Sequence, residues 1–399
     1  MKYDFEKRVD RSGENTSSKW MGMYRKKKNV SAGVIPLSVA DMELYNPPEI
    51  TEGLKKYLDE AVLGYTRPGA RFTGAVLRWM KDRHSWEVKP EWLVQSPGVV
   101  PALFLAVRAV TEAGDGVIIQ PPVYYPFSMA IQAGGRRLVS NPLKIEGGRY
   151  VMDYEDLQAK ARDGRNRALI LSSPHNPVGR VWTREELART AEICAQSGVT
   201  VISDEIHFDL LLPGHTHTVF AALSKTAGEN AIICTAPSKT FNIAGMQISN
   251  IIIPNEKIRE RFRKELMDSA IHEPNILGLK ACEIAYTECG PWLDAFLGHL
   301  AANHRITRDF FAEHLPMVTV FPLEGTYLQW LDFRALGLEP KALEEFMVNE
   351  AEWFVDEGYI FGEGGAGFER VNLACPASVL SEAFDRLLRA ARKRGWAGR

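Results

Sequence analysis

Four short, continuous apolar runs constrain the fold of this chain more than any other feature. They occupy residues 117–120, 168–171, 199–202 and 231–234, and helix-like segments separate them. Apolar runs of this length are typical of strands that are buried on both faces. Because they alternate with helices, the sequence predicts an α/β fold with a mostly parallel sheet between helices.

One of the intervening helices carries clear start and stop signals. Thr183 and Glu186 have the spacing of a capping box, in which each side chain bonds the backbone of the other residue. We expect this helix to continue to Gln196 and to end at Gly198, before the next strand. The segment therefore predicts one strand–helix–strand unit.

After residue 255 the pattern changes to longer helices with few strand signals. Strands are predicted at residues 318–321, 326–331 and 370–374, and an early one at residues 34–40. We therefore expect a large domain over residues 48–287 and a smaller α+β domain built from residues 1–47 and 288–399.

Charge and cysteine content limit the kinds of partner and location. The 399 residues carry a net charge of −2, so we expect neither nucleic acid nor a membrane as partner. Five cysteines without paired spacing and a polar N-terminus without a signal core predict a reducing, cytoplasmic location. His215 and His217 share a loop, but no third ligand has a recognisable spacing, so we predict no metal site.

The most informative polar side chain is Lys239, which follows the apolar run at residues 231–234. At the exit of a buried strand a lysine is partly desolvated, which lowers its pKa and frees its amine to attack a carbonyl. Ser238 and Thr235 could bind an anionic group beside it. A solvated surface lysine is the simpler interpretation, but this setting favours an aldehyde cofactor bonded to Lys239.

Further polar residues follow the other strands, and ligands of open α/β sheets bind at the carboxyl ends of the strands. Gly98 precedes a helix whose first N–H groups could hold a phosphate. Tyr124 or Tyr125 could stack on a flat ring, and Asn176 could donate to a phenolic oxygen. Each of these residues also fits a simpler role in a turn or in packing.

Three charged or titratable residues complete the set. Asp204 ends a buried strand and needs a partner, for which a protonated pyridine nitrogen is suitable. His207 could contact a cofactor oxygen or be satisfied within the protein. Arg370 leads into an apolar strand and needs an anion, either a substrate carboxylate or an acidic residue at a domain interface.

Together these positions resemble the fold-type I pyridoxal-phosphate (PLP) enzymes, the aspartate-aminotransferase-like superfamily, over nearly the whole chain. The resemblance implies the PLP-dependent transferase fold and PLP as the cofactor. Within the superfamily, four motifs are similar to the MalY/PatB-type C–S lyases, which are cystathionine β-lyase-like enzymes. These motifs are Ala40-Asp-Met42, Ser203-Asp-Glu-Ile-His207, Ala236-Pro-Ser-Lys-Thr-Phe-Asn242 and Asn372-Leu-Ala-Cys-Pro376.

The resemblance also implies roles around the cofactor ring. Lys239 would bond to the PLP aldehyde, and Asp204 would pair with the ring nitrogen. Asn176 would bond the phenolic oxygen, with His207 at the place where many aminotransferases have a tyrosine. Tyr124 would stack on the ring.

The remaining implied roles concern the phosphate and the substrate. Val99, Val100 and Ser238 would hold the phosphate. Tyr65 would reach the phosphate from the neighbouring subunit, which implies a homodimer. Arg370 would bind the α-carboxylate of an amino-acid substrate.

The expected function is β-elimination from cystathionine or a related S-substituted L-cysteine, giving pyruvate, ammonia and a thiol. An aminotransferase of class I/II is the alternative, because the same residues serve both reactions. Gln247 favours the lyase, since many aminotransferases have a phosphate-binding arginine at this position. A PLP-fold regulatory or binding protein with little catalysis is a third possibility, against which the presence of Lys239 and Asp204 argues.

Overall fold

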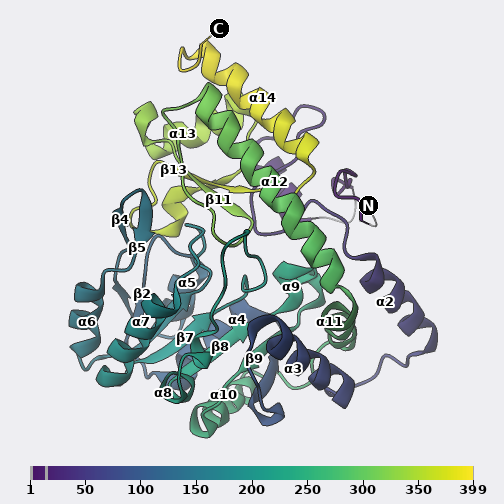
Figure 1. Cartoon of the computed structure of the whole chain (residues 1–399), viewed down its shortest axis with the longest axis vertical. Coiled ribbons are helices and arrows are strands. Elements are labelled where there is room, and N and C mark those ends of the chain that lie inside the picture. Colours follow the sequence, from purple (N-terminus) through teal and green to yellow (C-terminus); the bar gives the residue numbers. More distant parts are fainter. Residues whose placement is uncertain (1–2, 14–16, 399) are drawn as a thin grey trace.

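The computed structural model describes residues 3–13 and 17–398 of the chain. Two main sheets organise these residues, and the seven-stranded sheet lies below the four-stranded sheet in Figure 1. The seven-stranded sheet draws on residues 93–252 and the four-stranded sheet on residues 319–372. The predicted large domain, residues 48–287, contains all strands of the seven-stranded sheet, and the strands of the four-stranded sheet lie outside this range. The division into two domains stays a prediction.

The seven-stranded sheet confirms the predicted fold class. All neighbouring strands from β8 to β3 are parallel, while β9 is antiparallel to both of its neighbours. The four predicted apolar runs form β2, β6, β7 and β8 in its centre. In spatial order the strands are β1 (Leu93–Ser96), β9 (Ser249–Ile252), β8 (Ala231–Thr235), β7 (Thr200–Asp204), β6 (Asn166–Ser172), β2 (Gly116–Ile119) and β3 (Arg137–Ser140).

Apolar clusters cover both faces of this sheet, which explains why its central strands are apolar on both sides. Neighbouring residues such as Val117 and Ile118 belong to opposite clusters. One cluster includes helices α4 (Val99–Val110), α5 (Pro126–Ala133) and α10 (Glu256–Asp268). The other includes α3 (Ala70–His84), α6 (Tyr154–Arg162), α7 (Arg184–Ser197), α8 (Lys225–Glu229) and α11 (Ile276–Glu288).

Helix α7 has the predicted start and stop signals. Thr183 Oγ1 accepts the Glu186 N–H at 3.2 Å, and the Glu186 carboxylate accepts the Thr183 N–H at 2.7 Å. Gly198 follows the helix with a φ of 66°, a left-handed conformation that glycine adopts without steric cost. The capping box and the terminating glycine are therefore confirmed.

The four-stranded sheet is antiparallel throughout, and its order is β10-β11-β13-β12. Its strands are β10 (Thr319–Val320), β11 (Leu328–Asp332), β12 (Asp356–Glu357) and β13 (Phe368–Asn372). Three of them overlap the predicted strands, with boundaries that differ by one or two residues. The C-terminal helices are α12 (Gly290–His314), α13 (Pro340–Phe346) and α14 (Ala377–Lys393); the remaining elements are α1 (Ser18–Lys26), α2 (Pro48–Glu60) and the hairpin β4 (Lys144–Glu146) and β5 (Arg149–Val151).

The strand predicted at residues 34–40 is wrong, since this segment has no strand structure. Leu37 does exchange backbone hydrogen bonds with Phe354 and Asn372, but the pairing stops there. At Val39 the backbone turns with a φ of 57°, which an L-residue adopts only under strain. Apolar composition alone could not reveal this turn.

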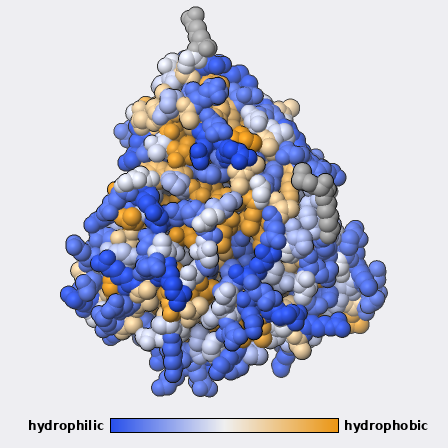
Figure 2. Space-filling view, in the orientation of Figure 1, coloured by the Kyte–Doolittle hydropathy of each residue, from blue (hydrophilic) through white to orange (hydrophobic). Residues whose placement is uncertain are grey.

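The outer surface shows mixed polarity. In Figure 2, hydrophobic residues gather along the middle of the face, and hydrophilic residues dominate toward the lower rim. Among residues 3–13 and 17–398, no helix combines the length and the apolar character needed to cross a membrane.

Candidate active site

One cavity lies at the carboxyl ends of the central strands, where sequence analysis expects a ligand. Eight of the ten predicted site residues contribute to its wall: Val99, Val100, Tyr124, Asn176, Asp204, His207, Ser238 and Lys239. Arg370 and Tyr65 do not line it. The structure therefore brings residues from five separate segments of the chain to one cavity.

Lys239 lies on the short helix α9 (Pro237–Thr240), directly after β8. Its Nζ donates a hydrogen bond of 2.6 Å to the backbone carbonyl of Ala40. Burial lowers the pKa of this amine to about 8; Asp41 opposes the change, and Arg370 adds to it. At neutral pH a lysine with this pKa has a far larger neutral, nucleophilic fraction than an exposed lysine.

Asp204 is the last residue of β7 and is buried. Burial raises the pKa of its carboxyl to about 7, although the Ile206 N–H and Lys239 favour the charged form. The hydrogen bond from the Ile206 N–H, at 3.2 Å, is weak support for a buried carboxylate. A cationic ring nitrogen in the cavity would supply the missing partner, so Asp204 fits the expected cofactor.

His207 is buried on the wall of the cavity. Its ring contacts Tyr327 edge-on, with centroids 5.9 Å apart, and its Nδ1 has no hydrogen-bond partner. Burial lowers the pKa of the imidazole well below its usual range, and Lys239 and Arg370 add to this effect. His207 is therefore neutral, with one ring nitrogen available to a ligand.

Helix α4 begins at the cavity with unpaired backbone donors. Its N-cap is Gly98, which has a φ of 117° and no side chain to cap the helix. Gly98, Val99 and Val100 line the cavity, and Ser238 and Gln247 also contribute to its wall. The N-terminus of a 12-residue helix beside a hydroxyl is a suitable site for a phosphate. The phosphate of the expected cofactor thus also fits this part of the cavity.

Asn176 lines the cavity and contacts Arg370, which does not line it. Arg370 Nη1 donates to Asn176 Oδ1 at 2.8 Å, and Arg370 Nη2 donates to Asp356 Oδ2 at 2.5 Å. The Asn176 amide therefore turns its oxygen toward Arg370, which leaves its NH₂ group for a ligand. The Arg370 guanidinium also lies over the Phe361 ring, 4.7 Å from its centroid.

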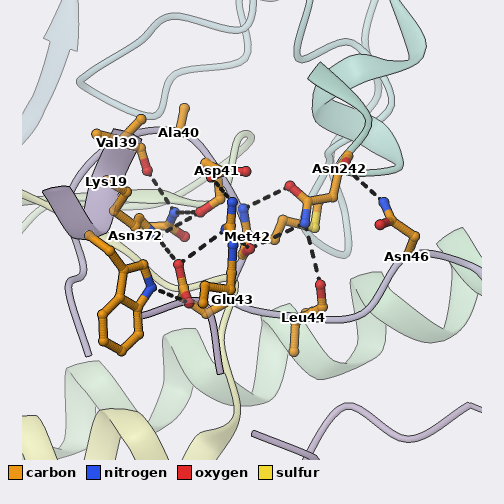
Figure 3. A network of polar contacts seen from close by, with 12 residues as sticks. Lys19, Val39, Ala40, Asp41, Met42, Glu43, Leu44, Asn46, Asn242 and Asn372 are labelled. Atoms are coloured by element: carbon orange, nitrogen blue, oxygen red, sulfur yellow. Dashed lines mark hydrogen bonds and ion pairs between the residues drawn. The ribbon is translucent and has the colours of Figure 1, made fainter. Parts of the chain in front are cut away.

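Residues 39–46 form a strap, which Figure 3 shows with its polar contacts to Asn242 and Asn372. The Ala40 carbonyl of this strap accepts the hydrogen bond from Lys239. Asn372 Nδ2 donates to the carbonyls of Val39 and Asp41, both at 2.8 Å. Asn242, three residues after Lys239, accepts the Met42 N–H at 3.0 Å. The strap thus connects β13 of the four-stranded sheet with the loop that carries the lysine.

A buried ion pair supports the strap from its other side. Lys19 and Glu43 are both buried, with their charged atoms 3.2 Å apart, and Lys19 Nζ also donates to the Asp41 carbonyl at 2.7 Å. The Trp20 indole donates to the second Glu43 oxygen at 3.1 Å. Since both charges are paired and hydrogen-bonded, the N-terminal helix α1 fixes the strap without an uncompensated buried charge.

Tyr65 does not contribute to the cavity wall of a single chain. It belongs to the loop between α2 and α3, and 98% of its surface is exposed. Leu58, Val62 and Leu63 on the same stretch are also exposed. Such a group of apolar side chains on the surface is typical of an interaction site.

The two histidines weighed as metal ligands have separate environments. His217 is buried, and its Nε2 lies 2.8 Å from Glu205 Oε2, whereas His215 lies in an exposed part of the loop. In the described part of the chain, no group of three or more His, Cys, Asp or Glu side chains could hold a metal ion. His217 therefore serves as a structural partner of Glu205.

Sequence analysis missed two participants. Ala40 contributes only a backbone carbonyl, which no residue type signals. Asp356 reaches Arg370 because it is its cross-strand neighbour in the β12–β13 pair. An acidic residue paired with an arginine on an adjacent strand is a detectable signal, but only after the strand pairing is known.

Comparisons with known proteins cover nearly the whole chain, including the residues of the cavity. The family model of aminotransferase class I and II matches residues 32–387. Cystathionine beta-lyase PatB of Bacillus subtilis (strain 168) is 42% identical over 387 residues, which cover 96% of this chain and 98% of that protein. Protein MalY of Escherichia coli (strain K12) is 31% identical, with coverage of 98% and 99%.

Solved structures agree with this fold. The crystal structure of cystalysin from Treponema denticola, which contains a pyridoxal 5'-phosphate cofactor, has a TM-score of 0.97 and 51% identity, covering 99% of this chain and 100% of that chain. The PLP-bound C–S lyase from Staphylococcus hominis has a TM-score of 0.90 and 30% identity, covering 97% and 98%. The fold is that of the PLP-dependent enzymes, and the chain belongs to the aminotransferase class I and II family.

Proposed function

We propose that this protein is a PLP-dependent C–S lyase that acts on cystathionine or related S-substituted L-cysteines. With cystathionine and one water, the products are pyruvate, ammonia and homocysteine. The observation that carries the proposal is the pair of Lys239 and Asp204 on one cavity, an amine with a pKa of about 8 and a carboxyl with a pKa of about 7. The similarity to cystathionine beta-lyase PatB along nearly the whole chain supports the choice of reaction.

Bound PLP supplies an electron-withdrawing ring that stabilises negative charge at the α-carbon of the substrate. The Asp204 carboxylate would hold the proton on the ring nitrogen and so maintain that withdrawal. The NH₂ group of Asn176 and the neutral His207 ring would lie at the phenolic oxygen. Tyr124, whose backbone N–H donates to the Asn176 carbonyl at 3.1 Å, would stack on the ring.

The phosphate would bind at the start of α4. The backbone N–H groups of Val99 and Val100 and the Ser238 hydroxyl are the proposed donors. Gln247 adds a neutral amide rather than a cation. The partial positive charge at the N-terminus of α4 therefore carries more of the phosphate binding than in a site with an arginine.

Lys239 is the proposed base for the α-proton. With a pKa of about 8, roughly a tenth of the amine is neutral at pH 7, compared with less than about a thousandth for an exposed lysine. Arg370 would bind the α-carboxylate and orient the α C–H bond toward the amine. Loss of the thiolate from the β-carbon then completes the elimination.

We also propose a homodimer in which Tyr65 reaches the phosphate of the neighbouring subunit. The exposed group of Leu58, Val62, Leu63 and Tyr65 supports this assembly, because pairing would remove these side chains from water. Sedimentation should give twice the mass of the chain, and Tyr65→Ser should weaken PLP binding. A monomer that binds PLP with unchanged affinity would contradict this arrangement.

A cytoplasmic location stays part of the proposal. Five cysteines without paired spacing support a reducing compartment.

A pyruvate assay tests the function. PLP-loaded protein and L-cystathionine, with no keto acid added, should release pyruvate steadily, as followed with lactate dehydrogenase and NADH. Lys239→Ala should abolish this release while the thermal unfolding midpoint of the cofactor-free protein stays within a few degrees of the wild-type value.

Other outcomes identify the competing functions. Product formation that requires a stoichiometric keto acid would establish an aminotransferase. A protein that fails to take up PLP would indicate a regulatory or binding role. Substantial pyruvate release by the Lys239→Ala variant would refute the assignment of this lysine.

A further inference from the structure

The guanidinium of Arg370 already holds a carboxylate in this structure. Arg370 is 3% exposed, and Asp356 Oδ2 accepts its Nη2 at 2.5 Å. Asn176 Oδ1 accepts a hydrogen bond from Nη1 at 2.8 Å, while Nε is buried without a hydrogen-bond partner. The guanidinium has five N–H groups, so a substrate carboxylate still finds donors, but it must share the single positive charge with Asp356 unless that neighbour yields.

Asn176 is held too firmly to be the neighbour that yields. It is buried between Pro174 and Pro177 in sequence, and its backbone N–H donates to Ser172 Oγ at 3.2 Å. Its backbone carbonyl accepts the Tyr124 N–H at 3.1 Å. A displacement of Asn176 would therefore disturb the loop on which Tyr124 lies.

Asp356 has a looser setting. It lies on β12, a strand of two residues at the edge of the four-stranded sheet, and its side chain is 15% exposed. The same Oδ2 atom also accepts the N–H of Val39 at 2.7 Å. Val39 is itself 41% exposed at the strained turn of the strap. Asp356 is thus the more exposed of the two neighbours and lies on a two-residue strand, although Asn372 also holds the Val39 carbonyl at 2.8 Å.

We propose that Asp356 is an internal stand-in for the α-carboxylate of the substrate, and that the two carboxylates compete for Arg370. Asp356 neutralises the buried cation while the site is empty and competes with the incoming carboxylate. It is a positioning residue that acts through Arg370 and sets the affinity for amino acids. The inference rests on the proposed role of Arg370 in the function above.

The exchange also reaches the lysine. Asp356 holds the Val39 N–H, and the next residue, Ala40, holds Lys239 Nζ through its carbonyl. Release of Arg370 by Asp356 therefore acts on the strap beside the reactive amine. Binding of the substrate carboxylate to Arg370 is therefore connected to the position of Lys239 through Val39 and Ala40.

The test compares two ligands that differ in the carboxylate. L-Alanine and L-alaninamide both carry the amine and lack a β-leaving group, so their binding to the PLP-loaded enzyme can be followed by cofactor absorbance without β-elimination. Asp356→Asn places a neutral oxygen where Oδ2 accepts both hydrogen bonds. Since a neutral acceptor holds a guanidinium less strongly than a charged one, the Kd of L-alanine should fall by about tenfold. The Kd of L-alaninamide should change by less than about twofold.

A matched control is Asp332→Asn. Asp332, the last residue of β11 in the same sheet, pairs with Arg334 at 2.7 Å, but the Arg334 side chain is 56% exposed whereas Arg370 is buried. This substitution should leave both dissociation constants unchanged. If Asp356→Asn does not fold, Asp356→Ser keeps a short acceptor for the Val39 N–H and should shift the two constants in the same directions.

Two results would overturn the inference, and Arg370→Gln separates them. If Asp356→Asn weakens L-alanine or leaves it unchanged while Arg370→Gln weakens L-alanine selectively by tenfold or more, Asp356 is no competitor, and the proposed function stands. If Arg370→Gln affects both ligands equally, Arg370 does not bind the carboxylate. In that case both the inference and this part of the proposed function fail.

Discussion

Replacing Asp204 with asparagine should stabilise the cofactor-free protein and disable the PLP-loaded enzyme. The structure buries the Asp204 carboxyl and gives it one backbone donor, the Ile206 N–H. In the folded, cofactor-free protein its negative charge is therefore unfavourable. An asparagine has nearly the same shape and cannot ionise, so it removes this cost.

The magnitude follows from the pKa of this carboxyl. A rise from 3.8 to about 7 corresponds to roughly 4 kcal/mol at pH values above 7. Structural relaxation reduces this figure, whereas the favourable interaction with Lys239 is already contained in the pKa of about 7. We expect a net gain of about 1–3 kcal/mol for Asp204→Asn at pH 8.

The pH dependence has a defined sign. Between pH 3.8 and about 7 the folded protein keeps a proton on Asp204 that the unfolded chain has released. The folded state thus binds more protons, so this group lowers the stability as the pH rises through that window. The advantage of the variant over the wild type should grow from pH 5 to pH 8 and then level off.

Urea unfolding of the cofactor-free proteins at pH 5, 6, 7 and 8, followed by tryptophan fluorescence, measures this difference. Asp163→Asn is the control, because Arg165 lowers the pKa of that exposed carboxyl to about 2 and it stays ionised throughout. With PLP bound, Asp204→Asn should lose about a hundredfold or more in pyruvate release, since the amide cannot hold the ring proton. A variant that is less stable than the wild type at pH 8, or a difference that does not depend on pH, would refute this account of the carboxyl.

Three further predictions concern the lysine, the phosphate site and the strap. In the cofactor-free protein, labelling of Lys239 with an amine reagent, quantified by mass spectrometry between pH 6 and pH 11, should have a midpoint near pH 8. Asp41→Asn should lower this midpoint, because Asp41 favours the charged amine; a midpoint near 10.5 would show that burial does not control it. Gly98→Ala should weaken PLP binding by about tenfold in equilibrium dialysis, because a φ of 117° is nearly restricted to glycine, whereas an added Cβ would meet only Pro101 Cδ at 3.6 Å. An unchanged affinity would place the phosphate elsewhere. Asn242→Ala should cost about 2–3 kcal/mol in urea unfolding, because the Met42 N–H loses its acceptor and an alanine must adopt a φ of 57°. Asn242→Gly, which loses the same hydrogen bonds without the strain, should cost about 1 kcal/mol less, and equal costs would exclude backbone strain as a contribution.

The sequence by itself predicted the central sheet and therefore the neighbourhood of Lys239 and Asp204. Buried parallel strands must be apolar on both sides, so the four runs were visible without any long-range information. Parallel strands also present their carboxyl ends at one edge, which brings together residues that follow different strands. The capping box of α7 was equally local, because its partners are three residues apart.

The tertiary structure alone decided how the lysine and the arginine are held. The first two residues of the strap were predicted as the end of a strand, yet the conformation of the strap depends on Asn242 and Asn372, which are about 200 and 330 residues away in sequence. The Ala40 carbonyl has no residue-type signal, and Asp356 meets Arg370 only through the register of β12 and β13. Local patterns record which residues prefer which element, whereas contacts between distant segments depend on how the two sheets pack, and no short stretch of sequence encodes that arrangement.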